Sequence, residues 1–183
     1  MKNIQILDKS FKLYLPHEDI QMAIDNVAQR VNSDLKNCDT PVFLCVLTGA
    51  FMFLSDLMKR INVLSDIAFI RVASYEGTQS TGEVKEIMGL TTDLKDKTVI
   101  IVEDIVDTGT TIAELHKIVS EAGAKEIKVC TLLLKPNAYK GNIKIDYAAI
   151  EIPNDFIVGY GLDYNQLGRH YKDIYVINED KNL

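Results

Sequence analysis

The chain has 183 residues, of which 47% are hydrophobic and 25% are charged. This length suits one domain with a sizeable core, and the composition argues against a disordered protein. The formal net charge is -6 and the sequence holds no Lys/Arg cluster, so we expect no nucleic-acid partner. An acidic chain that binds an anion must use backbone N–H groups, a few well-placed cations or metal ions.

The cysteines and the most apolar window also restrict the class of protein. Three cysteines, an odd number at spacings that match no metal motif, predict reduced thiols and a cytoplasmic location. The N-terminus lacks the basic and apolar regions of a signal peptide. The window Pro41–Met58 is interrupted by Thr48-Gly49 and Ser55-Asp56, which favours a strand, a turn and a helix over a membrane span. We therefore expect no membrane partner.

Strands and helices alternate from the first apolar stripe onward. Residues of one helical face predict an amphipathic helix over Pro16–Lys36. The continuous apolar run Val42–Leu47 predicts a strand buried on both faces, and a helix is predicted over Ala50–Ile61. The next three predicted segments are a strand over Ile67–Ala73, a polar loop over Tyr75–Gly82 and a returning strand over Val84–Leu90.

The second half of the chain begins with the strongest buried-strand signal, Thr98–Val102, which ends in acidic residues. A helix over Thr111–Ala122, stopped by Gly123, and a strand over Ile127–Leu134 follow. Short apolar pieces after Lys135 predict a small irregular C-terminal lobe; they are Tyr147–Ile152, Phe156–Tyr160 and Ile174–Ile177. The alternation predicts an α/β fold with a mostly parallel twisted sheet flanked by helices.

The run Val102–Thr111 (VEDIVDTGTT) is the predicted ligand-binding and catalytic segment. Ligands of open parallel sheets bind beyond the carboxyl ends of the strands, where Glu103, Asp104 and Asp107 stand. A Gly-containing turn that enters a helix presents N–H groups and the helix dipole to a phosphate. The turn residues are Thr108, Gly109, Thr110 and Thr111, and Thr111–Glu114 also fits a capping box. Two adjacent acids can accept hydrogen bonds from the hydroxyls of a ribose diol, directly or through Mg²⁺. Asp107 can accept a proton or stabilise developing positive charge.

Two other interpretations of this run are open. The acids could cap a helix with Thr and Gly making the turn, or one aspartate could accept phosphate as in a response-regulator receiver domain. The ten-residue run is more specific than either, because it resembles the phosphoribosyl-pyrophosphate signature of the type I phosphoribosyltransferases. That resemblance implies a soluble enzyme with phosphoribosyl pyrophosphate as a substrate.

The stretch from about Leu47 to Asp173 resembles the hypoxanthine–guanine branch of that family. The resemblance implies a pyrophosphate-binding loop at Thr48 and Gly49, where the family often has Lys in place of Thr48, with a non-proline cis peptide bond. It implies that Ser74 and Tyr75 open a mobile active-site loop. It also implies that Lys135 contacts the 6-oxo group of a purine.

The segment Ile152–Arg169 (IPNDFIVGYGLDYNQLGR) adds to the resemblance to the hypoxanthine–guanine branch. By resemblance, Phe156 stacks on the base and the backbone of Ile157 meets the purine edge. Asp163 helps to place a second Mg²⁺ through its water shell, and Arg169 binds pyrophosphate. The spacer Gln166-Leu167-Gly168 departs from the more aromatic one that is common in the family.

The resemblance implies one phosphoribosyltransferase domain over residues 1–183, with hood elements from the N-terminus and from about 136–173. The implied reaction transfers 5-phosphoribosyl to N9 of hypoxanthine or guanine, with Asp107 as the catalytic residue and Mg²⁺ held near Glu103, Asp104 and Asp163. A homodimer or homotetramer is implied as well. A xanthine-preferring enzyme, an orotate or adenine branch, and a non-catalytic regulator that senses the phosphoribosyl donor remain alternatives.

Overall fold

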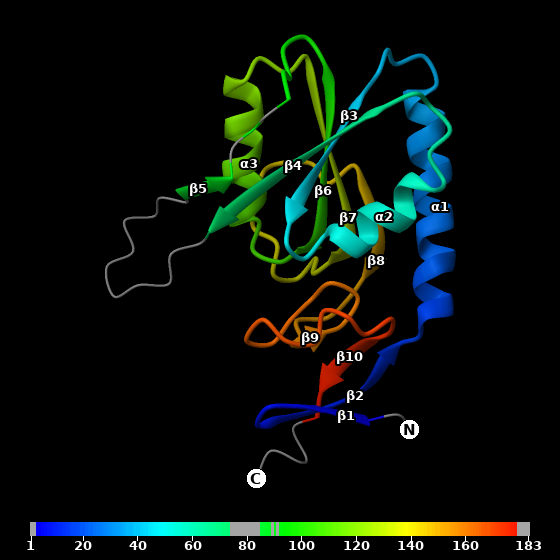
Figure 1. Ribbon diagram of the computed structural model, residues 1–183, viewed down its shortest axis with the longest axis vertical. Coiled ribbons are helices and arrows are strands. Elements are labelled where there is room, and N and C mark those ends of the chain that lie inside the picture. The colour runs from blue at the N-terminus through cyan, green and yellow to red at the C-terminus, as the bar shows by residue number, and fades with distance from the viewer. Residues whose placement is uncertain (1–2, 74–84, 89, 91, 179–183) are drawn as a thin grey trace.

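The computed structural model describes residues 3–73, 85–88, 90 and 92–178, and its larger sheet has the strand order β5-β4-β3-β6-β7-β8 (Figure 1). The strands are β3 (Val42–Leu47), β4 (Asp66–Ala73), β5 (Lys85–Met88), β6 (Thr98–Val106), β7 (Glu126–Leu134) and β8 (Tyr147–Glu151). Neighbours from β4 to β8 are parallel, and β5 is antiparallel to β4. The predicted α/β fold with a mostly parallel sheet is therefore confirmed.

Helices cover both faces of this sheet. The helices α1 (His17–Leu35) and α2 (Phe51–Met58) lie on one face and α3 (Thr110–Glu121) lies on the other (Figure 1). Alternate residues of β3 enter different cores, since Phe43 packs in the cluster of α1 and α2 whereas Leu44 packs in that of α3. Burial on both faces explains the unbroken apolar sequence of this strand.

A second, four-stranded sheet lies beyond the carboxyl ends of the parallel strands (Figure 1). Its antiparallel order is β1 (Asn3–Ile6), β2 (Lys9–Leu15), β10 (Ile174–Ile177) and β9 (Ile157–Val158). We call this sheet together with residues 159–173 the hood. The N-terminal hairpin was not among the elements predicted from the sequence. Its second strand, β2, is held in the sheet by β10 from the far end of the chain, and among the described strands β1 pairs only with β2.

The structure corrects several predicted boundaries. The sixth strand continues past Val102 to Val106, so that Glu103 and Asp104 belong to the strand. The ladder to β7 keeps its register through this part, with Glu103 opposite Thr131 and Val106 opposite Leu134. The fifth strand covers Lys85–Met88, and α2 ends at Met58. The predicted loop over Tyr75–Gly82 lies outside the described residues.

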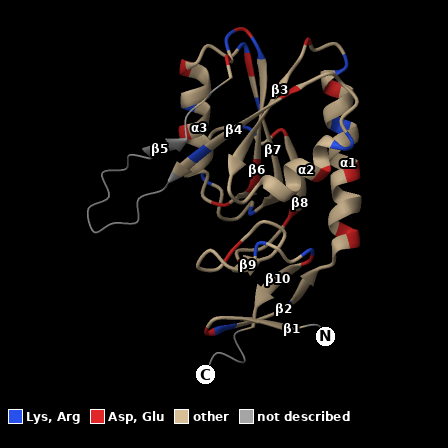
Figure 2. Cartoon of the chain, viewed as in Figure 1, with Lys and Arg blue, Asp and Glu red and all other residues tan. Residues whose placement is uncertain are grey.

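The charged side chains of the helices are mostly acidic. The helix α1 carries four Asp or Glu residues and a single Lys or Arg residue, Arg30, and α3 carries Glu114 and Glu121 with Lys117 between them (Figure 2). Among the helices of the described residues, none combines the length and the apolar character that a membrane crossing requires.

The N-terminus of α1 is capped from the other end of the chain. The buried carboxylate of Asp173 accepts a hydrogen bond from the backbone N–H of His17 at 3.0 Å and one from the Tyr175 hydroxyl at 3.2 Å. Pro16 at the N-cap position makes no side-chain cap bond. A carboxylate at this end also interacts favourably with the helix dipole. Asp173 thereby joins the hood to α1.

We expect Asp173→Ala to lower the free energy of unfolding by about 0.5–2 kcal/mol, the usual cost of losing a helix cap. Urea titrations followed by circular dichroism measure this loss. The matched control is Asp155→Ala, which removes an exposed aspartate of the same lobe. Equal stability of the two variants would show that the Asp173 cap contributes nothing.

Candidate active site

A cavity of about 460 Å³ is lined by residues from the carboxyl ends of β3, β4 and β6, by the turn after β6 and by Arg169 of the hood. Its wall is built by four segments that are distant in sequence. The predicted site residues on this wall are Thr48, Gly49, Glu103, Asp104, Thr108, Thr110, Thr111 and Arg169. A smaller adjoining cavity of about 240 Å³ is lined by residues 103–112, which adds Asp107 and Gly109 to the same region.

The two acids at the end of β6 are the electrostatic centre of this cavity. Glu103 is only 6% exposed, and its Oε2 has no hydrogen-bond partner among the described residues. Burial and the neighbouring charge of Asp104 raise the pKa of Glu103 well above its usual range. Burial also raises the pKa of Asp104, against the opposing effects of its hydrogen bonds and of the Arg169 charge. A buried and a half-buried carboxylate, with one oxygen of Glu103 lacking a partner among the described residues, are a suitable environment for a cation.

The turn that follows β6 leads into α3. The helix begins at Thr110 with Gly109 as its N-cap at a φ of +92°, and it has no side-chain cap hydrogen bond. The predicted capping box at Thr111–Glu114 is therefore wrong, since Thr111 already lies in the first helical turn. An N-terminus without a side-chain cap leaves first-turn N–H groups for a ligand.

Tyr139 fixes the conformation of this turn. A Cβ at Gly109 would lie 2.4 Å from Cε2 of the Tyr139 ring, so only glycine fits there. The backbone N–H of Lys140 also donates to the Thr108 carbonyl at 3.3 Å. Tyr139 was not predicted as a site residue, because nothing in the local sequence links it to the turn.

The loop after β3 contains the cis peptide bond Leu47-Thr48, which confirms what the family resemblance implied. Its glycine is surrounded closely on two sides. A Cβ at Gly49 would lie 1.6 Å from Oδ2 of Asp104, and a Cβ at Gly161 would lie 2.0 Å from the Gly49 carbonyl oxygen. The loop is thus wedged between an acid of β6 and the hood, and Gly161 is a second residue that was not predicted as part of the site. Its place in the G-x-G run Gly159-Tyr160-Gly161 was the available signal.

Arg169 reaches the cavity from the hood. Its Nη1 donates to the Gly161 carbonyl at 2.8 Å, and its Nη2 lies 2.6 Å from Oδ1 of Asp163. The other oxygen of Asp163 accepts from the backbone N–H of Gln166 at 2.7 Å. Positive φ angles at Gln166 and Gly168 allow the tight loop between the acid and the arginine. Asp163 therefore stands beside Arg169 as an ion-pair partner.

Lys135 and Asp107 form a second ion pair next to the acids. Their Nζ and Oδ2 atoms are 2.8 Å apart, and Lys135 is only 8% exposed. The pair follows from strand register, because Val106 lies opposite Leu134 and each functional residue comes directly after its strand. Lys135 also donates its backbone N–H to the Val106 carbonyl at 2.9 Å.

The remaining predicted site residues lie farther along the hood or outside the described residues. The Phe156 ring is 45% exposed and meets Tyr164 edge-on at 5.9 Å, whereas Ile157 is buried in β9. Neither residue lines the two cavities above. Ser74 and Tyr75 lie outside the described residues.

The fold and the cavity define a phosphoribosyltransferase domain, and the Phosphoribosyl transferase domain model matches residues 10–165. The hypoxanthine-guanine phosphoribosyltransferase of Aquifex aeolicus is 34% identical over 176 residues, covering 96% of this chain and 99% of the relative. A crystal structure of a Staphylococcus aureus hypoxanthine phosphoribosyltransferase has a TM-score of 0.86 at 37% identity, covering 92% of each chain.

A solved structure from Trypanosoma cruzi is also similar to this chain. A structure from work on the C-terminal region, oligomeric state and activity of the Trypanosoma cruzi hypoxanthine phosphoribosyl transferase has a TM-score of 0.86 at 32% identity. It covers 97% of this chain and 96% of that one. The chain belongs to the hypoxanthine-guanine phosphoribosyltransferase family.

Proposed function

We propose that this protein transfers 5-phosphoribosyl from phosphoribosyl pyrophosphate to N9 of hypoxanthine or guanine, giving IMP or GMP and pyrophosphate. The observation that carries the proposal is the one cavity in which a helix N-terminus, the acids Glu103 and Asp104 and the guanidinium of Arg169 meet. These groups match the parts of the donor, which has a 5-phosphate, two ribose hydroxyls and a pyrophosphate. We also propose that residues 1–183 act as one domain, with the hood closing the site.

Different segments of the cavity wall bind different parts of the donor. In this proposal Thr108, Gly109, Thr110 and Thr111 bind the 5-phosphate through the N-terminus of α3. Glu103 and Asp104 accept hydrogen bonds from the ribose hydroxyls. Thr48 and Gly49 hold the pyrophosphate together with the guanidinium of Arg169. The fixed positive charge and the backbone donors then stabilise the negative charge on the leaving pyrophosphate.

Mg²⁺ fits the acidic end of this site. The unpartnered Oε2 of Glu103 and the adjacent Asp104 offer the hard oxygen atoms that Mg²⁺ prefers, and Mg²⁺ in such sites usually joins one or two carboxylates to substrate phosphates. We propose Glu103 and Asp104 as the principal carboxylates, with Asp163 acting through water beside Arg169. A bound Mg²⁺ would neutralise charge that develops on the pyrophosphate.

The Lys135–Asp107 pair suits the edge of an oxopurine. A guanine or hypoxanthine base carries its 6-oxo acceptor next to N7, whereas adenine carries an amino donor at position 6. In the proposed complex Lys135 donates to the 6-oxo group and Asp107 accepts from N7. Phe156 stacks on the ring and the backbone of Ile157 meets its other edge.

Catalysis follows from the same assignment. Positive charge develops on the ribose as the bond to pyrophosphate breaks, and the purine must then attack through N9. Asp107 makes N9 more nucleophilic by accepting the N7 proton or a strong hydrogen bond from it. The site must exclude water, because water would capture the ribosyl cation-like species. We propose that the segment opened by Ser74 and Tyr75 serves as this lid.

We expect Lys135→Ala to raise KM for hypoxanthine and guanine by about 10- to 100-fold, the scale of a lost hydrogen bond to a charged group. Discrimination against adenine should fall in the same variant. Steady-state assays with all three bases measure both effects. The matched control is Lys140→Ala, an exposed lysine five positions later in the chain. Unchanged oxopurine KM and unchanged adenine discrimination would refute the role of Lys135.

We further propose a homodimer or homotetramer in the cytoplasm. Phe51, Ile67 and Phe69 are each about 40% exposed and come from α2 and β4, which gives an apolar surface of the kind that subunits bury. The cysteines Cys38, Cys45 and Cys130 are free, in keeping with a compartment where thiols stay reduced.

The decisive experiment is a steady-state assay with phosphoribosyl pyrophosphate and each of hypoxanthine, guanine and xanthine, in Mg²⁺ and in EDTA. Turnover of hypoxanthine or guanine that EDTA abolishes supports the proposal. Turnover of xanthine alone would favour the xanthine-preferring alternative. Donor binding without turnover of any oxopurine would point to a donor-sensing regulator and overturn the enzyme assignment.

A further inference from the structure

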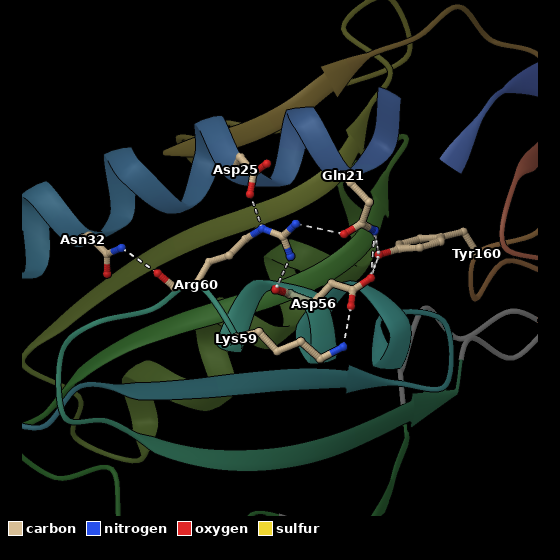
Figure 3. Close-up of polar contacts among 7 residues, drawn as sticks. All are labelled: Gln21, Asp25, Asn32, Asp56, Lys59, Arg60 and Tyr160. Carbon is tan, nitrogen blue, oxygen red and sulfur yellow. Dashed lines mark hydrogen bonds and ion pairs between the residues drawn. The ribbon is translucent and has the colours of Figure 1, made fainter. Parts of the chain in front are cut away.

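A polar network joins α1, α2 and the hood through residues that do not line the cavity (Figure 3). The hydroxyl of Tyr160 donates to Oδ2 of Asp56 at 2.5 Å, and the Gln21 amide donates to the same oxygen at 2.9 Å. The other oxygen of Asp56 pairs with Lys59 at 2.8 Å. Arg60 completes the network by donating to the Gln21 carbonyl oxygen at 3.0 Å and pairing with Asp25.

The ends of this network lie next to the two halves of the proposed pyrophosphate site. Asp56 belongs to α2, which begins two residues after Gly49. Tyr160 directly precedes Gly161, whose carbonyl receives Arg169 and whose Cα lies against the Gly49 carbonyl. Backbone bonds from Tyr160 to Tyr171 at 2.8 Å and from Gly161 to Arg169 at 3.0 Å hold these segments together. Any movement of Tyr160 therefore also moves the Gly161 carbonyl that accepts the hydrogen bond from Arg169.

The side chain of Tyr160 is held in one position by burial and hydrogen bonding. Its side chain is fully buried, and its φ of +51° is uncommon for a residue with a bulky side chain. Burial alone would raise the pKa of Asp56, but hydrogen bonds from Lys59, Tyr160 and Gln21 lower it to about 2. Burial and the bond to Asp56 raise the pKa of Tyr160, so the phenol stays a donor to a charged acceptor at neutral pH. Hydrogen bonds to charged acceptors are the stronger kind.

We propose that Tyr160 and Asp56 are positioning residues, whose hydrogen bond holds Arg169 and Gly161 of the hood against the Thr48–Gly49 loop for pyrophosphate binding. The inference rests on the proposed function. The 5-phosphate turn, by contrast, is formed by β6 and α3 and is buttressed by Tyr139, which has no part in the network. The Tyr160–Asp56 bond should therefore influence one end of the donor and leave the other end unaffected.

The test compares two ligands on one variant. Tyr160→Phe removes the hydroxyl and keeps the ring, and we expect it to raise Kd for pyrophosphate with Mg²⁺ by roughly five- to tenfold. This is less than the full contribution of a hydrogen bond to a charged group, because the bond acts on pyrophosphate only through Gly161 and Arg169. Kd for IMP, which carries the 5-phosphate but no pyrophosphate, should not change. Asp56→Asn should act in the same direction, and the double variant should be less than additive because both changes break one bond. Calorimetric titrations of each ligand give these constants.

The matched control is Tyr147→Phe. Tyr147 is 2% exposed and its hydroxyl donates to Asp34 at 2.7 Å, so this variant also loses a buried tyrosine–aspartate bond, but it joins β8 to α1 away from the cavity. It should lower Tm and leave both Kd values unchanged. Equal weakening of pyrophosphate and IMP by Tyr160→Phe, or unchanged pyrophosphate affinity, would overturn the positioning role. If the unsubstituted protein bound neither ligand, the proposed function would fail and the inference with it.

Discussion

Replacing Asp107 with Asn should lower kcat by about 10²–10⁴-fold, the usual contribution of a positioned acid or base. The side chain keeps its size and can still accept a hydrogen bond from Lys135, whose Nζ lies 2.8 Å from the carboxylate. It can no longer take a proton from N7 of the purine. The loss should therefore appear in kcat, with a much smaller change in KM for the base. Single-turnover measurements separate this chemical step from product release.

Asp146→Asn provides the comparison for this variant. Asp146 also pairs with a lysine, Lys144 at 2.9 Å, but it lies just before β8, at the opposite end of the strand from the cavity. Its substitution should leave kcat unchanged. A kcat of Asp107→Asn near that of the unsubstituted protein would exclude Asp107 as the group that acts on the purine.

The parallel sheet and the donor turn were predictable because local sequence encodes them. Val42–Leu47 is apolar at each position and lies in the middle of the sheet, buried on both faces. The acids in the last part of β6 and the glycine turn after it occupy one short run, so their proximity needed no tertiary information. The family resemblance, rather than the residues themselves, supplied the cis bond at Leu47-Thr48.

Contacts between distant segments could not be predicted in this way. The capping box at Thr111 satisfied a local pattern, yet the N-cap is Gly109, which has a left-handed conformation and lies too close to the Tyr139 ring for a Cβ. Asp173 caps a helix that begins 156 positions earlier in the chain. Tyr160 meets Asp56 across 104 positions. Asp173 and Tyr160 meet their partners because the hood packs on α1 and α2, and Tyr139 meets Gly109 from the segment that follows β7. No short window of sequence contains these contacts.

Gly49→Ala should lower kcat/KM for phosphoribosyl pyrophosphate by about 10²-fold or more, the scale reported when reacting groups are misplaced by about 1 Å. The added Cβ would lie 1.6 Å from Oδ2 and 2.4 Å from Cγ of Asp104, so the carboxylate must swing away. The loop cannot retreat instead, because Gly161 already lies against the Gly49 carbonyl on the hood side. One methyl group therefore disturbs both the proposed metal carboxylate and the pyrophosphate loop.

Gly123→Ala distinguishes this effect from the general cost of replacing a glycine. Gly123 ends α3 at a φ of +81°, and its nearest neighbour to an added Cβ is Cγ of Lys95 at an ordinary 3.6 Å. That variant should lose stability through backbone strain, seen as a lower Tm, while kcat/KM stays unchanged. Gly49→Ala should show the reverse order of effects, with catalysis reduced far more than Tm. Unaltered kcat/KM in Gly49→Ala would mean that Asp104 can move without consequence, and its assignment to the ribose and the metal would then be wrong.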